Sequence, residues 1–490
     1  MIDAPTMPDV VQVPSSSRKQ AVRNAAEQLA WVLPEWRRLN RYFHEEDAKY
    51  LRFLVPPGLR VLELGCGNGW LLDQLAPSEG VGVDFSPAMI ERARAAYPQH
   101  RFVVGDIEDA TLIDFLAGFP AFDVVLLADT IGQLEDVQTT LSQLHRLCGP
   151  QTRLIVSYHS VFWFPILKLA ERLGLKMPTL SENWLSTDDI ASLMHLSGFE
   201  EVKREWRQLL PKRLLGLGSL VNRFVGTLPL VRRLCVRNYV VARPLQARRG
   251  PPDSVSIVIP CRNERGNIEP AIQRLPQVAR DQEVIFVEGH SSDGTLAEIE
   301  RVIASYPALD IKVAVQDGRG KGDAVRKGFQ LARGEVLVIL DADLTVPPED
   351  LPKFVEAMAA DRSEFVNGSR LVYPMEGEAM RFLNLVANQL FAYLFSFLLN
   401  QRFTDTLCGT KVLRKSDYER IAAGRSYFGE IDPFGDFDLI FGATKLNLKI
   451  AEVPIRYRAR SYGETQISRF RHGLLLLRMV VFAWRKLKAF

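Results

Sequence analysis

The sequence predicts an α/β protein built from two doubly wound domains, each with a mostly parallel sheet covered by helices. Two observations carry this prediction. An apolar strand runs into a glycine-rich turn at 60–69, and a second series of buried strands, from 254 onward, ends in acidic residues. The length of 490 residues is too great for one ordinary domain, and a hydrophobic content of 47% is ample for two cores.

Composition divides the chain into five parts. Residues 1–20 are polar, contain three prolines, lack the apolar core of a signal peptide and are expected to form a disordered tail. Residues 244–253, rich in proline and arginine, are expected to link two domains at 21–243 and 254–465. Residues 466–490 predict an amphipathic helix at the membrane interface.

The distribution of charge is more informative than the net charge of +3. From Trp206 to Pro252 there is no acid, and the segment 206–237 mixes Lys and Arg with Leu, Val and Phe. The scarcity of aromatic residues disfavours a nucleic-acid partner, which would need a base-stacking platform. Docking on anionic lipid explains the composition, and core packing against the first sheet is the rival interpretation. The five cysteines form no CxxC pair, which is typical of a reducing cytosol.

The first domain contains strands that end in acids. ELGCGNG at 63–69 follows an apolar strand and precedes a helix, so its glycines allow a ligand to approach the backbone at a helix N-terminus. Asp84 ends the next strand, at the place where an acid can hydrogen-bond ribose hydroxyls. Asp106 follows a third strand, and 122–127 is a fourth. The pattern indicates a nucleotide-type ligand at one edge of the sheet.

The series ELGCGNG, VGVDFSPAMIERAR, VVGDIED and FDVVLLADTIGQLED closely resembles class I S-adenosylmethionine-dependent methyltransferases, over roughly residues 42–244. A generic dinucleotide site is the alternative interpretation. The resemblance implies a Rossmann-like fold and three groups of cofactor contacts: the methionine moiety at Glu63, Gly65 and Gly67, the ribose at Asp84, and the adenine at Asp106 and Ile107.

The methyl acceptor is not legible in the sequence. Tyr42 and His44 precede the glycine strand and could cap the cofactor pocket, although His44 is favoured as a structural residue. Tyr158 and His159 end a strand and are better placed on the ligand side of an open sheet. Methyl transfer needs alignment of the nucleophile with the methyl group more than it needs a particular catalytic side chain.

The second domain centres on an apolar strand at 336–340 that ends in Asp341 and Asp343 and is stopped by two prolines. Carboxylates at the end of a buried strand are costly without a cationic partner. A divalent ion held by a carboxylate and by substrate phosphates supplies one, while an ordinary Asp-x-Asp turn is the alternative.

IPCRNERGNI, VEGHSSDGT, RGKGDAVRKGF and the Asp341-Ala-Asp343 motif resemble family-two glycosyltransferases of the GT-A fold, within them the dolichyl-phosphate mannose synthases and their bacterial polyprenyl-phosphate relatives. The resemblance implies that Asp341 and Asp343 bind Mg²⁺ or Mn²⁺ on the diphosphate of a nucleotide sugar. Glu288-Gly289 replaces two adjacent aspartates of the family, which leaves the nucleotide base open. Thr345 replaces a glutamine at the third metal position, so metal coordination is expected to rely more on phosphate and water. The implied donor contacts are Pro260, Asn263, Glu264, Glu288, Asp293 and Lys321.

Three arginines match the positions with which this family cradles the acceptor phosphate: Arg370, Arg381 and Arg460. A phosphate monoester is already an anion near neutral pH, so it needs cations to position it more than a base to deprotonate it. Surface salt bridges are the alternative interpretation for each arginine.

Two apolar segments bear on the membrane. Residues 382–401 carry no formal charge and are long enough to span a bilayer, but their amide side chains favour a buried or interfacial helix. Arg471, Arg478 and Arg485 lie seven residues apart on one helix face, which indicates an in-plane membrane helix; a core helix with one solvated face is the alternative.

Together the motifs predict a bifunctional, membrane-associated transferase that is cytoplasmic and peripheral at the inner face of the membrane. One domain is expected to transfer a hexose to a polyprenyl phosphate with inversion. The other is expected to methylate an unidentified acceptor, on the same glycolipid pathway or elsewhere. Glycosyl transfer to a non-lipid acceptor, and a membrane-recruited scaffold with two inactive nucleotide folds, are the competing hypotheses.

Overall fold

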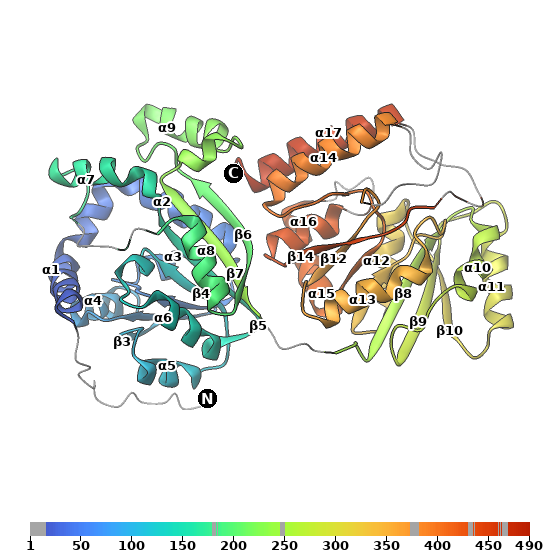
Figure 1. Cartoon of the computed structure of the whole chain (residues 1–490), viewed down its shortest axis with the longest axis horizontal. Coiled ribbons are helices and arrows are strands. Elements are labelled where there is room, and N and C mark those ends of the chain that lie inside the picture. The colour runs from blue at the N-terminus through green and yellow to red at the C-terminus, as the bar shows by residue number, and fades with distance from the viewer. Residues whose placement is uncertain are drawn as a thin grey trace. The chain divides into compact units, whose positions relative to one another are not determined.

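A computed structural model describes residues 16–178, 183, 185–245, 250–372, 382–429, 435, 437–458, 460, 462 and 469–490, with backbone only at 382–386 and 469–472. The chain forms two compact units, Met1–Leu245 and Gln246–Phe490 (Figure 1). The division falls inside the linker expected at 244–253.

Unit 1 contains a seven-stranded sheet in the order β3-β2-β1-β4-β5-β7-β6. The pairs from β3 to β5 are parallel, and β7 pairs antiparallel with both β5 and β6. Strand order reverses between β1 and β4, the place where open α/β sheets bind ligands beyond the strands' carboxyl ends. The strands are β1 Arg60–Leu64, β2 Glu79–Asp84, β3 Arg101–Val104, β4 Phe122–Ala128, β5 Cys148–His159, β6 Phe199–Arg207 and β7 Arg237–Pro244.

The first helix begins before the expected boundary of the tail. Ser16 caps α1 by accepting a hydrogen bond from the Lys19 backbone N–H at 3.1 Å, so residues 17–20 are its first turn and the expectation of a disordered 1–20 is wrong there. Residues 1–15 lie outside the described part. The helices are α1 Ser17–Leu39, α2 Arg41–Leu54, α3 Trp70–Gln74, α4 Pro87–Ala96, α5 Ala110–Ala117, α6 Val137–Gln143, α7 Phe164–Arg172, α8 Thr187–Leu196 and α9 Leu217–Leu220.

Unit 2 repeats the same principle with a sheet in the order β10-β9-β8-β11-β13-β12-β14. Here β13 is antiparallel to β11 and β12, the other pairs are parallel, and the order reverses between β8 and β11. The strands are β8 Ser254–Cys261, β9 Asp281–Glu288, β10 Asp310–Val315, β11 Val336–Ile339, β12 Phe365–Ser369, β13 Lys411–Arg414 and β14 Ile450–Pro454.

Helices α14 and α17 run side by side on unit 2 (Figure 1). Phe395 and Leu399 of α14 are buried, whereas Leu390 and Tyr393 are exposed, so the segment expected at 382–401 is a helix with one packed and one open face. In the described parts of the chain, no helix combines the length and the apolarity needed to cross a membrane. The helices are α10 Ile268–Gln273, α11 Thr295–Ser305, α12 Lys321–Leu331, α13 Leu351–Ala359, α14 Phe382–Leu399, α15 Lys415–Ala423, α16 Phe437–Lys445 and α17 Arg469–Leu487.

Candidate active sites

The glycine turn after β1 is built so that Asp84 closes it. The Asp84 carboxylate accepts hydrogen bonds from the backbone N–H groups of Gly67, at 2.8 Å, and Ser86, at 3.0 Å. Gly65 has φ +80°, and a Cβ there would overlap the Thr130 side chain, so only glycine fits. Burial raises the pKa of Asp84 to about 6 despite these two bonds.

Glu63, at the buried end of β1, is an incompletely satisfied acid. Its side chain is buried, burial raises its pKa to about 8, and the Leu72 backbone N–H is its hydrogen-bond donor. Its Oε2 finds no hydrogen-bond partner among the described residues. A buried acceptor of this kind fits a cationic ligand group, such as the amino group of a methionine moiety.

One cavity of about 330 Å³ collects all six residues expected to contact the methyl donor. Helix α1 forms its roof with apolar side chains that include Leu29 and Leu33. Lys19 of the same helix bridges Asp106, at 2.5 Å, and Glu108, at 2.7 Å. Burial alone would lower the pKa of Lys19, but these two acids raise it above its ordinary value. The side chains that line the cavity therefore fit S-adenosylmethionine. The sequence did not predict that helix α1 covers this site.

Among the residues expected on the acceptor side, His44 lines the cavity, whereas Tyr158 and His159 do not. His44 lines the cavity, and burial, assisted by the charge of Arg37, lowers its pKa to about 4, so the imidazole is neutral. Tyr158 does not line it: this buried side chain donates a hydrogen bond to the Asn183 carbonyl at 2.7 Å. His159 lies 3.2 Å from Asp129 and stacks on Phe43.

A buried network at the end of the cavity went unrecognised in the sequence. Arg237 of β7 is fully buried and donates hydrogen bonds to both carboxylate oxygens of Asp47, at 3.0 and 3.1 Å, and to Asp129. Both acids line the cavity. Burial alone would raise the pKa of Asp129, but Arg237 and His159 hold it well below its ordinary value. Asp47 and Arg237 are 190 residues apart, so no local motif could have identified them.

In unit 2, a cation lies on each carboxylate of the Asp341-Ala-Asp343 motif. Lys321 Nζ at the start of α12 is 2.6 Å from Asp341 Oδ1. Arg460 Nη2 is 2.7 Å from Asp343 Oδ2, and its Nη1 is 3.2 Å from Glu264 Oε1. Burial alone would raise the pKa of Asp341, but Lys321 holds it below its ordinary value. These ion pairs involve five of the predicted residues and make this edge of the sheet strongly polar.

The motif can accommodate a divalent ion only with help from a ligand. Within the described ranges, no group of three or more His, Cys, Asp or Glu side chains gathers to hold a metal. Two carboxylates at a sheet edge still fit Mg²⁺ or Mn²⁺ that completes its shell with phosphate oxygens and water. The hydroxyl of Thr345, which stands at the position of the missing glutamine, donates to Asp343 Oδ1 at 2.8 Å and orients that carboxylate.

The other expected donor contacts shape the loops around this edge. The Asn263 side chain accepts a hydrogen bond from the Ser292 backbone N–H at 2.9 Å. Glu288 accepts hydrogen bonds from the backbone N–H groups of His290 and Ser291, and Asp293 accepts one from Thr295. Pro260 lies in β8 opposite Val287. These side chains therefore hold the β8 and β9 loops in place in this structure.

Arg370 is a partly buried side chain that forms an ion pair with the buried Asp405. Two of its three guanidinium nitrogens donate to Asp405, at 2.6 and 2.9 Å, and its guanidinium carbon lies 5.2 Å from the centroid of the Tyr457 ring. Asp405 was not predicted from the sequence. Arg381 lies outside the described residues.

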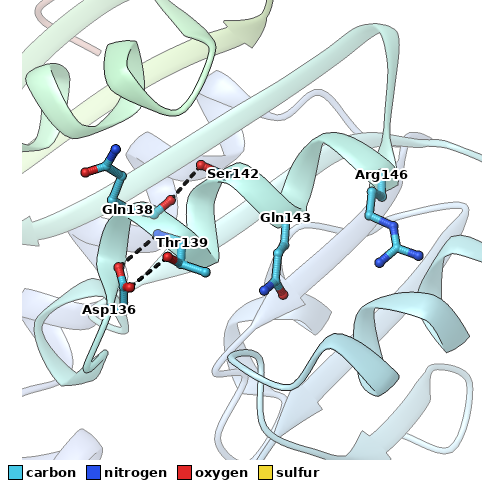
Figure 2. Close-up of a pocket in the computed structure, with 6 residues that line it drawn as sticks. All are labelled: Asp136, Gln138, Thr139, Ser142, Gln143 and Arg146. Carbon is cyan, nitrogen blue, oxygen red and sulfur yellow. Dashed lines mark hydrogen bonds between the residues drawn. The ribbon is translucent and has the colours of Figure 1, made fainter.

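Figure 2 shows a separate surface pocket along α6. The Asp136 carboxylate there accepts hydrogen bonds from the Thr139 backbone N–H, at 2.9 Å, and hydroxyl, at 2.7 Å, and Ser142 donates to the Gln138 carbonyl at 2.9 Å. The two bonds to Asp136 cap the helix and the third lies within it, and no predicted site residue lines this pocket.

Comparison with known proteins assigns each unit. Residues 256–422 match the model of glycosyl transferase family 2, and residues 36–204 match that of a methyltransferase domain. A dolichyl-phosphate hexose transferase from Haloferax volcanii is 30% identical over 47% of this chain and 93% of its own length. A dolichol-phosphate mannosyltransferase from Pyrococcus furiosus is 29% identical over 44% of this chain. The match spans 59% of that archaeal relative's length.

A solved methyltransferase from Thermotoga maritima, described as a possible histamine N-methyltransferase, covers 45% of this chain and 99% of its own, with 19% identity and a TM-score of 0.35.

Proposed function

Because the chain belongs to glycosyl transferase family 2, we propose that unit 2 transfers one hexose from a nucleotide sugar to a polyprenyl phosphate, with inversion at the anomeric carbon. The supporting observation is the acid–cation cluster at the sheet edge, in which Asp341 and Asp343 each hold a cation within 2.7 Å. The two relatives described above are named as transferases to dolichol or dolichyl phosphate, which favours a lipid phosphate as the acceptor.

The roles of the residues follow from their charges. Asp341 and Asp343 would bind Mg²⁺ or Mn²⁺, which neutralises the donor diphosphate and the leaving nucleotide. Lys321, displaced from Asp341, would bind a phosphate oxygen of the donor. Arg460, displaced from Asp343, would position the acceptor phosphate together with Arg370, which Asp405 holds in place.

For unit 1, the proposal is methyl transfer from S-adenosylmethionine bound beneath α1. Asp84 would exchange its Gly67 contact for ribose hydroxyls, and Glu63 would accept the amino group of the methionine moiety. Neutral His44 in the cavity wall can accept a proton from an acceptor hydroxyl or amine.

Helix α17 supports placement at a membrane surface. Leu474, Leu477 and Val481 are exposed along it, and Arg478 and Arg485 are exposed on the same side. A helical face that mixes exposed apolar and cationic side chains suits anionic headgroups. The protein would then work as a peripheral enzyme at the cytoplasmic side of a membrane, where polyprenyl phosphate is presented.

The experiment is mass spectrometry of lipid extracts incubated with the protein and a panel of nucleotide sugars. A new lipid heavier by one hexose, formed only with a divalent ion, supports the proposal. Sugar appearing on a soluble molecule while the lipids stay unchanged would favour the non-lipid acceptor, and no turnover of any donor would favour the inactive scaffold.

The same extracts test whether the two activities share a product. Labelled S-adenosylmethionine is added with and without the nucleotide sugar. Label that enters the lipid only after glycosylation supports a common pathway, whereas label on an unrelated soluble molecule contradicts it.

A further inference from the structure

Unit 1 exposes an unusual amount of apolar surface in two segments, 161–175 and 214–234, called here the α7–α9 surface. Fifteen of the thirty large apolar side chains that are exposed in the described residues lie in these two segments. Leu215 is fully exposed, Leu230 is 87% exposed, and Phe162 is 74% exposed. Contiguous apolar surface of this kind marks an interaction site in a water-soluble fold.

The two segments form one continuous surface. Trp163, in the turn before α7, donates its indole N–H to the Leu234 carbonyl at 2.7 Å. Figure 1 shows α7 and α9 at the same end of unit 1. The surface also adjoins the cofactor cavity, because Met177 and Pro178, which follow α7, line that cavity.

Hydrogen bonds from buried side chains fix the segment 214–234 in the conformation that exposes its apolar residues. The buried Asn222 side chain bonds to both backbone groups of Leu210, at 2.8 Å each, and to the Tyr42 hydroxyl at 3.0 Å. Gln208 donates to the Phe43 carbonyl at 3.0 Å. These bonds tie the segment to the start of α2, next to His44 of the cavity wall. Leu215 also has φ +54°, a left-handed conformation that is costly for leucine and here keeps it at the tip of the turn.

Charge identifies the occupant. Residues 206–235 contain six Lys or Arg residues and no acid, and Arg213, Arg223 and Arg233 are exposed among the leucines. The acid of α7, Glu171, is already paired with Lys168 and Lys176 at 2.9 and 2.7 Å. Protein–protein interfaces deplete charge at their apolar centre, whereas a surface that mixes exposed leucine and arginine suits anionic lipid headgroups over acyl chains.

We propose that the α7–α9 surface docks unit 1 on an anionic lipid bilayer, independently of helix α17. The rim of the methyl-donor cavity then lies at the membrane, and a membrane-borne acceptor can reach His44 without crossing bulk water. This proposal rests on unit 1 alone and does not depend on the glycosyl transfer assigned to unit 2.

The test is hydrogen–deuterium exchange of the full chain with and without vesicles of equimolar phosphatidylglycerol and phosphatidylcholine. Slower exchange in both segments of the surface when vesicles are added supports the proposal. Protection confined to 469–490 overturns it and leaves membrane docking through α17 intact. Slow exchange of both segments in the absence of vesicles, together with a doubled mass of the protein in ultracentrifugation, also overturns it, because a second copy of the chain then covers the surface.

Matched variants make the test specific. Leu215→Ser combined with Leu230→Ser should weaken vesicle binding about tenfold, since two leucines no longer enter the bilayer. Leu196→Ser on α8 is the control, because Leu196 is 64% exposed in the same unit and lies outside the surface. Arg213→Glu with Arg223→Glu should weaken binding to these vesicles and leave the melting temperature unchanged. If both double variants bind the vesicles as tightly as the unsubstituted protein does, the assignment of this surface to lipid docking is refuted.

Discussion

Arg460 offers the sharpest test of the site in unit 2, because its guanidinium forms an ion pair with Asp343, a carboxylate that is expected to bind the metal. Its guanidinium lies 2.7 Å from Asp343 and 3.2 Å from Glu264, and its side chain is 25% exposed. Divalent-ion binding at Asp343 must displace or repel this charge. Replacing Arg460 with Ala should therefore tighten the binding of Mn²⁺ in the absence of nucleotide.

The size of the effect follows from the contact that is lost. A hydrogen bond to a charged group contributes about 1.5–3 kcal/mol, and partial exposure of this pair favours the lower end. The dissociation constant for Mn²⁺ should then fall on the order of tenfold. Sugar transfer should fall as well, because the acceptor phosphate loses a proposed partner, so metal affinity and activity should change in opposite directions.

Titration calorimetry with Mn²⁺ measures this directly. Arg458→Ala is the matched control, since Arg458 is an exposed arginine two residues earlier in the chain and its backbone N–H, which the substitution keeps, bonds to Thr345. Its Mn²⁺ affinity should equal that of the unsubstituted protein. If Arg460→Ala leaves Mn²⁺ binding unchanged or weaker, the reasoning that Arg460 competes with the ion is wrong.

Four further predictions concern both units. Asp343→Ala should abolish metal-dependent sugar transfer and leave S-adenosylmethionine binding unchanged. Asp84→Ala should leave sugar transfer unchanged and weaken S-adenosylmethionine binding, measured by calorimetry, by about 1–3 kcal/mol. Loss of both activities from either change would contradict independent sites. Binding of the full chain to anionic vesicles should weaken as salt rises, and equally strong binding to neutral vesicles would count against an electrostatic contribution. The unfolding free energy of unit 1 should fall by about 1.4 kcal/mol per pH unit between about pH 6.5 and 8, above the range in which Asp84 and His44 titrate, because Glu63 is ionised there in the unfolded chain and stays protonated up to a pKa near 8 in the folded one; Glu63→Gln should remove this slope in denaturant titrations, and an unchanged slope would refute it. Arg370→Met should destabilise unit 2 by about 3–5 kcal/mol in a denaturant melt by leaving the Asp405 charge buried without this partner, and adding Asp405→Asn should recover part of that loss; a small effect of the single change would show that the pair is not a structural one.

The sequence predicted the sites best where function depends on strand ends. Parallel strands bring their carboxyl ends to one edge, so motifs such as Asp84 after β2 and Asp341 after β11 locate both sites without knowledge of tertiary contacts. The strand predicted at 336–340 agrees with β11 to within one residue at either end. Family-model matches over both halves agree with the two resemblances drawn from these motifs.

Long-range contacts explain what the sequence could not predict. Arg237, Asp47 and Asp129 meet only because β7, α2 and the end of β4 pack together, and nothing local in any of the three segments signals an ion pair. Tyr158 stands at a strand end, as a ligand-binding residue would, but its hydroxyl is used by the Asn183 carbonyl. A side chain's position along a strand is therefore a weaker guide to its role than the partner it finds.

Glycosylation of a lipid phosphate by unit 2 is tested most directly with a purified polyprenyl phosphate, a carbon-13-labelled nucleotide sugar and Mn²⁺. Mass spectrometry and NMR of the organic phase should detect a polyprenyl phosphate carrying one labelled hexose, with its anomeric configuration inverted relative to the donor. Asp343→Ala should form none. Release of free labelled sugar or of a labelled soluble product, with the lipid unchanged, would show that unit 2 does not glycosylate a polyprenyl phosphate.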